Sequence, residues 1–151
     1  MKVVLDTNVI VSALLTPSGN ASRILDLVIR GDLALLFDDR ILTEYRKVLL
    51  RPKFGFVAGD VDLVISFLES AGTKIVSSVL DEPSVSLDDV QFLEVAVTGA
   101  VDVLISGNKK HFKMKTKRNL RIMNPTEFME FWRRHSRPNA PIRKTSGADK
   151  D

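Results

Sequence analysis

Apolar residues along this 151-residue chain fall into two kinds of run. Some runs are short and continuous, as in strands buried on both faces, whereas others repeat every three to four residues, as on one side of a helix. The continuous runs predict strands over residues 2–5, 33–37, 74–79, 101–106 and 120–123. The periodic runs, several of them closed by Gly or Pro, predict helices over residues 8–15, 21–30, 41–50, 61–71, 88 or 89–98, and 125–134.

Buried strands that alternate with helices predict an α/β fold with a central parallel sheet. Because both faces of such a sheet must be covered, we expect a single-domain three-layer α/β/α arrangement over residues 1–134. Residues 135–151 lack periodicity and are polar, basic and Pro-containing, so they are interpreted as a C-terminal tail or arm. Ligands of parallel sheets bind beyond the carboxyl ends of the strands, which directs attention to the residues there.

Composition narrows the classes of protein only modestly. The apolar fraction of 44% and the charged fraction of 27% are ordinary for a globular domain. The absence of Cys excludes disulfides and thiolate metal sites. No apolar run approaches the roughly 18 residues that span a bilayer, and the N-terminus is a poor signal peptide. The sequence therefore favours a cytoplasmic protein with no membrane partner.

Charge is distributed unevenly along the chain. Residues 1–106 carry 9 Lys and Arg against 15 Asp and Glu, whereas residues 107–151 carry 13 basic and 4 acidic residues. Such asymmetry is typical of a chain that holds cations with one region and touches a polyanion with another. A basic tail without a partner would give the same count.

The stretch VVLDTNVIVSALL, residues 3–15, places Asp6 at the boundary between a buried strand and a buried helix. The carboxylate can cap the helix by accepting a backbone N–H. Alternatively, it can bind a metal ion at the carboxyl edge of the sheet. Thr7 and Asn8 could also cap the helix, so capping does not require the aspartate.

Glu44 lies near the buried face of the predicted third helix, three residues after Ile41 and four before Val48. A carboxylate at such a position is costly unless it is paired or bound to a cation. An ion pair with Arg40 or Lys47, or a tilt toward solvent, would account for it without a ligand.

Asp88 and Asp89 open the helix whose core face includes Phe92 and Ala96. Acidic residues in a first turn interact favourably with the helix dipole, so both could be there for stability alone. Asp89 precedes Phe92 by three residues and Ala96 by seven, which points it along the core side, as suits a residue reaching into a shared site. Asp88 points elsewhere and is interpreted as a cap.

Carboxylates gathered at strand exits, with no Cys and no zinc-like His spacing, suit hard cations such as Mg²⁺ or Mn²⁺. In proteins those ions activate water and neutralise phosphate oxygens during phosphodiester cleavage.

Four segments of the chain together resemble the PIN-domain nucleases, in particular the bacterial and archaeal branch described as toxin components of toxin–antitoxin pairs. The segments are VVLDTNVIVSALL, LTEYRKVLLRPKF, DDVQFLEVAVTGAVDVLISGN and IMNPTEFMEF, and the resemblance covers residues 2–132. The resemblance implies a metal-dependent ribonuclease that hydrolyses phosphodiester bonds of mostly single-stranded RNA. It also implies an antitoxin encoded in a neighbouring reading frame, and a homodimer.

Matched by position, the resemblance implies that Asp6, Glu44 and Asp89 are the catalytic and metal-binding acids. Small polar residues support them, namely Thr7, Asn8 and Ser106. In the family an aspartate commonly follows the penultimate strand, where this chain has Asn108. Its amide oxygen could still bind a metal ion or a metal-bound water, but one negative charge is lost. We therefore expect weaker binding of a second ion, which Asp88 would partly offset if it turned inward.

The stretch NKKHFKMKTKRNLR, residues 108–121, contains seven Lys or Arg and no acid. It begins beside the predicted metal site, so we expect it to contact RNA phosphates, although a solvated loop would have the same composition. Phe112 is a candidate for stacking on an unpaired base, but a core anchor under the loop is the preferred interpretation. The predicted RNA-binding side chains are Lys109, Lys110, Lys113, Lys115, Lys117 and Arg118.

Two rival functions remain. A phosphatase of the haloacid-dehalogenase type also begins with a strand and an aspartate, but it needs a second aspartate where this chain has Asn8. A catalytically weakened RNA- or partner-binding module on a PIN fold is favoured by Asn108 and opposed by the three retained acids.

Overall fold

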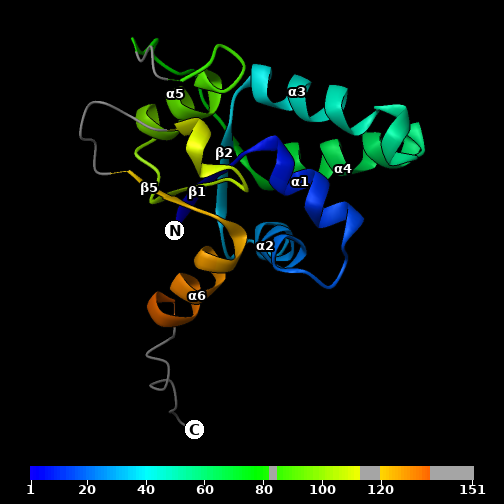
Figure 1. Ribbon diagram of the computed structural model, residues 1–151, viewed down its shortest axis with the longest axis horizontal. Coiled ribbons are helices and arrows are strands. Elements are labelled where there is room, and N and C mark those ends of the chain that lie inside the picture. The colour runs from blue at the N-terminus through cyan, green and yellow to red at the C-terminus, as the bar shows by residue number, and fades with distance from the viewer. Residues whose placement is uncertain (82–84, 113–119, 137–151) are drawn as a thin grey trace, which may run out of the picture.

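A computed structural model describes residues 1–81, 85–112 and 120–136. Five parallel strands form one sheet in the order β3-β2-β1-β4-β5, with β1 at its centre (Figure 1). The strands are β1 Lys2–Leu5, β2 Ala34–Phe37, β3 Thr73–Lys74, β4 Val103–Ile105 and β5 Arg121–Met123. The predicted α/β/α fold with a central parallel sheet is confirmed.

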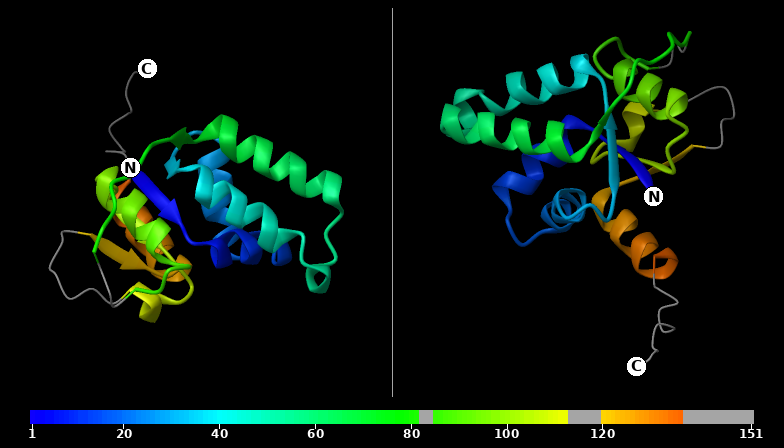
Figure 2. Two further views of the ribbon diagram at one scale, coloured as in Figure 1. Left: turned by 90° about the horizontal axis from the view of Figure 1, so that it is seen from above. Right: turned by 180° about the vertical axis from the view of Figure 1, so that it is seen from behind.

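Helices flank the sheet and contribute most of the hydrophobic core. They are α1 Thr7–Leu15, α2 Asn20–Ile29, α3 Asp39–Leu49, α4 Ala58–Ala71, α5 Val90–Thr98 and α6 Pro125–His135, with short 3₁₀ turns η1 Pro52–Phe54 and η2 Lys109–Phe112. Helix α5 packs on β1, β2 and β4, and α2 packs against both α1 and α6. Helices α3 and α4 run side by side and extend past the strands (Figures 1 and 2). Within the described residues, no helix is long and apolar enough to cross a membrane.

The predicted strand over residues 74–79 is wrong beyond its first residue. Only Thr73 and Lys74 pair with β2, and the N–H of Ile75 adds one further bond to Phe37. Next along the chain, the N–H of Ser78 is taken by the Thr98 side chain, 2.9 Å away on α5. The backbone after Ile75 is therefore bound by a side chain of α5 and does not continue the pairing with β2.

The carboxyl ends of the central strands place several chain reversals at one edge of the molecule. Leu5 ends β1 directly opposite Ile105, which ends β4. Asp6 and Ser106 follow these two residues, and α1 and α3 both begin at this edge. Polar side chains from distant parts of the sequence are thereby brought together.

Phe112 lies at the end of η2 and is 2% exposed within the core. The interpretation of this residue as a core anchor is confirmed, so its ring is not available to stack on a base.

Candidate functional site

Asp6 is a buried carboxylate, 5% exposed, at the junction of β1 and α1. Its backbone N–H continues the sheet by donating to the Ile105 carbonyl at 2.9 Å. Its Oδ1 accepts the N–H of Thr7 at 2.8 Å, so the side chain does cap the helix. Its Oδ2 is held by other groups, and capping therefore accounts for only half of the carboxylate.

A small polar network fixes Asp6 Oδ2. The Ser106 hydroxyl donates to it at 2.7 Å and Asn8 Nδ2 donates at 3.2 Å. Ser106 in turn accepts the N–H of Asn108 at 2.9 Å, and Asn8 Oδ1 accepts the N–H of Gly107 at 3.0 Å. Two residues predicted to support the site, Asn8 and Ser106, thus connect the end of β1 to the loop after β4.

The surroundings of Asp6 raise the pKa of its carboxyl. Burial raises the pKa of the Asp6 carboxyl, the hydrogen bond from Ser106 opposes that rise, and the negative charge of Asp89 adds to it. Directly beneath, the Tyr45 hydroxyl donates to the Leu5 carbonyl, and burial raises the pKa of Tyr45 well above its usual value. A cation beside Asp6 would offset both the cost of burying the charged carboxylate and its repulsion from Asp89.

The three predicted acids line one open groove of about 530 Å³. Asp6 reaches it from the end of β1, Glu44 from the middle of α3, and Asp89 from the residue that precedes α5. The remaining wall is made by side chains of α1, α3, η1 and η2, namely Thr7, Asn8, Val11, Ser12, Leu15, Thr16, Val48, Arg51, Phe54 and His111.

Glu44 is half-buried on α3 and faces this groove as well as a neighbouring hollow. The suggested ion pair with Arg40 does not form, because the guanidinium of Arg40 binds Asp38 and Glu94 instead. Within the part of the chain that the structure describes, Glu44 makes no ion pair.

Asp89 is held by two neighbours rather than by the N-terminus of α5. Its Oδ2 accepts from the Ser86 hydroxyl at 2.7 Å and lies 3.4 Å from His111 Nδ1. The other ring nitrogen of His111, Nε2, is 2.9 Å from Asn108 Nδ2. A chain of polar contacts therefore runs from Asp6 through Ser106, Asn108 and His111 to Asp89.

The remaining predicted residues are placed as follows. Asn108 contacts His111 and does not line the groove, and Asp88 is exposed. Lys109 pairs with Glu127 of α6 at 2.9 Å, and Lys110 is exposed. The predicted RNA-binding residues Lys113, Lys115, Lys117 and Arg118 lie outside the described residues, as does most of the predicted tail.

Three groove residues were missed by the sequence analysis. His111 was considered only as part of a zinc pattern, which it does not complete. Arg51 and Phe54 lie just beyond the predicted helix over residues 41–50, where no motif marks them as functional. No local pattern could have identified them, because only the folding of α3 alongside α1 brings Arg51 and Phe54 to the groove.

The donor chemistry of the groove fits a hard divalent cation. Carboxylate oxygens are the ligands that Mg²⁺ and Mn²⁺ prefer, and three carboxylates from three elements line the same space. Thr7 Oγ1, beside Asp6, is buried and is the one such side-chain atom among the described residues without a hydrogen-bond partner. In the same residues, no three Asp, Glu or His side chains stand close enough together to form a ready-made site. Asp6 is pre-positioned, and Glu44 and Asp89 would have to close on the ion.

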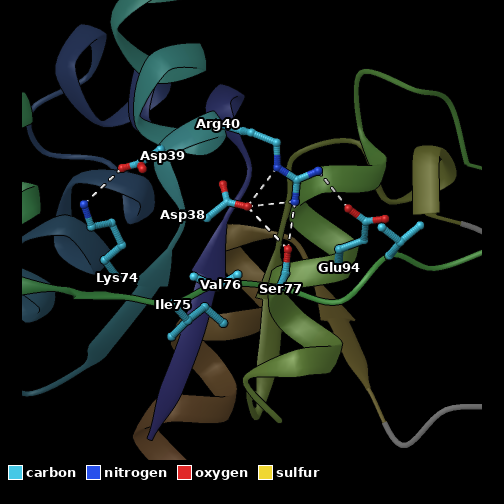
Figure 3. A pocket seen from close by; sticks show the side chains of 9 residues that line it. Asp38, Asp39, Arg40, Lys74, Ile75, Val76, Ser77 and Glu94 are labelled. Carbon is cyan, nitrogen blue, oxygen red and sulfur yellow. Dashed lines mark hydrogen bonds and ion pairs between the residues drawn. The ribbon is translucent and has the colours of Figure 1, made fainter.

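A second polar cluster braces this edge of the molecule. We call it the Arg40 clamp, consisting of Arg40, Asp38, Ser77 and Glu94 (Figure 3). The guanidinium contacts Asp38 Oδ2 at 2.7 Å, Glu94 Oε1 at 2.8 Å and Ser77 Oγ at 2.9 Å. Glu94, 4% exposed, also accepts the N–H of Leu80 at 2.9 Å. The clamp joins the start of α3, which carries Glu44, to α5, which follows Asp89.

Comparison with known proteins agrees with this architecture. An uncharacterized protein of Methanocaldococcus jannaschii, MJ1680, is 28% identical over 143 residues, which cover 86% of this chain and 90% of that protein. The crystal structure of VapBC2 from Rickettsia felis bound to a promoter DNA fragment contains a chain that superimposes with a TM-score of 0.58. That alignment has 16% identity and covers 82% of this chain and 98% of the other, so it shows a shared fold.

The PIN domain family matches residues 2–110, which include β1 to β4 and all the acids of the groove. The match covers well over half of the chain. This protein therefore belongs to the PIN-domain family.

Proposed function

We propose that this protein is a divalent-metal-dependent endoribonuclease that hydrolyses phosphodiester bonds of single-stranded RNA. Membership of the PIN-domain family supports a nuclease in general. The observation that carries the finer proposal is the buried Asp6 carboxylate, which shares a groove with Glu44 and Asp89 and has a raised pKa in the metal-free protein. A carboxylate kept in that environment, fixed by Ser106, is suited to binding a cation.

Asp6, Glu44 and Asp89 would hold one or two Mg²⁺ or Mn²⁺ ions. When bound, such an ion lowers the pKa of an attacking water and neutralises charge that develops on the phosphate. Ser106 and Asn8 fix the orientation of Asp6, and His111 and Ser86 fix that of Asp89. Val11 and Val48 add apolar side chains to the wall of the groove beside the acids.

The experiment is cleavage of a mixed-sequence single-stranded RNA by the full chain with Mn²⁺, with Mg²⁺ and with excess chelator. Duplex RNA and single-stranded DNA of the same sequence identify the preferred substrate. We expect cutting of single-stranded RNA that requires the ion and falls by more than about 100-fold in Asp89→Asn and Glu44→Gln, because losing even an indirect support of a metal ligand costs about 10–100-fold. Asp26→Asn, which changes an exposed acid on α2, is the matched control.

Cleavage that is equal in chelator and in Mn²⁺ would rule out the metal-dependent mechanism. A wild-type protein that binds RNA without cutting it would favour the rival function, a binding module on a PIN fold.

We further propose that the protein acts as the toxin of a toxin–antitoxin pair, with a small antitoxin protein as its partner. The support is its structural likeness to a chain of the VapBC2 assembly from Rickettsia felis. Co-expression with the product of a neighbouring short reading frame should restore growth that the toxin alone arrests. Growth that is unaffected by the active chain would contradict this role.

Asn108 offers a separate test of whether residue 108 takes part in metal binding. Its side chain contacts His111 and not the groove, so we expect Asn108→Asp to keep its carboxylate on the His111 ring and to change Mn²⁺ affinity by no more than about threefold. In Asn108→Asp combined with His111→Gln the carboxylate loses that ring partner, and the affinity should rise. Titration calorimetry with Mn²⁺ measures both. A tenfold gain in the single variant would instead place residue 108 among the metal ligands.

A further inference from the structure

The groove runs along two helices and continues beyond the acidic residues. On α1 it is lined by Val11, Ser12, Leu15 and Thr16, which recur at the spacing of one helical face. On the other side Glu44 and Val48 lie four residues apart on one face of α3, and Arg51, which follows the end of that helix, lines the same groove. Both helices begin at the carboxyl edge of the sheet, and their faces lead away from it.

The two ends of the groove differ in charge. Asp6, Glu44 and Asp89 occupy the end at the sheet, whereas Arg51 stands after the last turn of α3. Arg51 comes seven positions after Glu44 in the chain, beyond the C-terminus of α3, so the two side chains stand at different ends of the groove. Between the two ends Val11 and Val48 line the groove but are largely buried, whereas Leu15 is 50% exposed and lies beside the exposed Ser12 and Thr16.

Phe54 gives the basic end an aromatic surface. Its ring is half-buried, packs against the core from below and still lines the groove. Phe56 stacks beside Phe54 with the ring centroids 6.0 Å apart, and Lys53 Nζ lies 5.1 Å from the centroid of the Phe54 ring. Phe56 and Lys53 therefore hold the Phe54 ring in place, and Arg51 lines the same groove.

We propose that Arg51 and Phe54 form a subsite for a nucleotide that flanks the scissile phosphate of a single-stranded nucleic acid. The proposal rests on the proposed function, since the acidic end of the groove is taken as the place of cleavage. A base stacks on Phe54, a phosphate contacts Arg51, and the apolar stretch between them accommodates the sugar of the connecting nucleotide. The acids alone would repel the backbone, so a cation further along the groove is what retains it.

Single-stranded substrate follows from this arrangement. An aromatic side chain stacks on the face of an unpaired base, and bases in a duplex present no free face. Stacking also tolerates any base, so the subsite orients the strand without selecting a sequence. A neutral aromatic with adjacent Lys and Arg is the combination that single-strand binding proteins use for this purpose.

The test is a binding measurement that needs no catalysis. A fluorescein-labelled mixed-sequence RNA of ten nucleotides is titrated with the full chain carrying Asp6→Asn, in chelator and at low salt, and its anisotropy is recorded. Phe54→Leu keeps the apolar packing and removes the aromatic face, whereas Phe54→Tyr keeps both. Arg51→Gln removes the cation. Phe67→Leu and Arg23→Gln change an exposed aromatic and an exposed cation elsewhere and serve as matched controls.

We expect Phe54→Leu to weaken binding by about fivefold or more, with Phe54→Tyr close to the parent. Arg51→Gln should weaken binding and lower the salt dependence by about one counterion. The controls should bind as the parent does, and duplex RNA should show no effect of Phe54→Leu.

Failure of this inference is distinguishable from failure of the proposed function. If the parent cleaves single-stranded RNA but Phe54→Leu and Arg51→Gln bind it as the controls do, the subsite is wrong and the nuclease stands. If both variants lose affinity but the wild type never cleaves, the subsite stands and the nuclease is wrong. A parent chain that does not bind single-stranded RNA at all, or whose groove binds a protein partner but no RNA, would overturn the subsite.

Discussion

Asp6→Asn is expected to abolish metal-dependent cleavage while raising the melting temperature of the metal-free protein. The loss of activity should exceed about 100-fold, because Ser106 and Asn8 hold the buried carboxylate that we propose as a metal ligand. The gain in stability follows from the raised pKa of Asp6, which burial and the charge of Asp89 produce. The asparagine amide occupies the place of the neutral acid, with a donor where the protonated carboxyl has one.

The pH dependence of unfolding determines whether Asp6→Asn raises or lowers the stability of the protein. The Asp6 carboxyl releases its proton near 3.8 in the unfolded chain and at a higher pH in the folded one. Between those two values the folded state binds more protons, so this residue makes stability fall as pH rises through that window. The destabilisation grows from pH 3.8 up to the folded pKa and persists above it. Asp6→Asn removes this contribution and should therefore flatten the pH profile above 3.8.

Thermal unfolding in chelator from pH 3.5 to 8, followed by circular dichroism, measures both effects. Asp26→Asn, an exposed acid on α2, should match the wild type throughout. Added Mn²⁺ should raise the melting temperature of the wild type and leave Asp6→Asn nearly unchanged. A variant that is less stable than the wild type at pH 7 in chelator would mean that the Asp6 carboxylate stabilises the metal-free fold as a cap.

The positions of the acids in the chain could be predicted because they depend on local signals. A continuous apolar run marks β1, a helical pattern follows, and the residue between them must lie at the carboxyl edge of the sheet. Glu44 could be assigned to the edge of a buried helical face by the same periodicity. Asp89 was predicted to face the core side, and the structure brings it to the groove just before α5 begins.

Pairings between residues far apart in the sequence could not be predicted from local patterns. Arg40 was considered as a partner of Glu44 because the two share one helix, yet it binds Glu94, which lies 54 residues further along. The strand predicted after Lys74 failed for a related reason, because Thr98 and Glu94 of α5 capture the N–H groups of Ser78 and Leu80. Both depend on how α5 packs, which no pattern within either segment reveals.

Arg40→Leu is expected to lower the free energy of unfolding by about 2–3 kcal/mol and the melting temperature by about 5–10 °C. The guanidinium side chain is 46% exposed, but its partners Asp38 and Glu94 are only 11% and 6% exposed. Its removal leaves both carboxylates with little solvent and without a counter-charge, and the half-exposed position of Arg40 keeps the cost below that of a fully buried pair. Mn²⁺ affinity should fall about tenfold, because α3 and α5 carry or adjoin Glu44 and Asp89.

Arg46→Leu is the matched control for the Arg40 clamp. Arg46 is on the same helix and its side chain is 47% exposed, nearly equal to that of Arg40, but its partner Asp62 is 57% exposed. Since exposed ion pairs contribute about 1 kcal/mol or less, this variant should unfold close to the wild-type temperature and bind Mn²⁺ normally. The two substitutions therefore differ mainly in the burial of the carboxylates that they leave behind.

The double variant Arg40→Leu with Glu94→Gln separates the burial of a charge from the loss of packing. The amide that Glu94→Gln introduces can still accept the N–H of Leu80 but carries no charge to compensate, so the double variant should be more stable than Arg40→Leu alone. If it is not, the cost of Arg40→Leu comes from lost packing, and the clamp holds Glu94 by shape alone. If the double variant recovers stability but not Mn²⁺ affinity, the Arg40 guanidinium is needed to hold α3 and α5 in their relative positions at the groove. The Arg40 clamp would then position Glu44 and Asp89 as well as stabilise the fold.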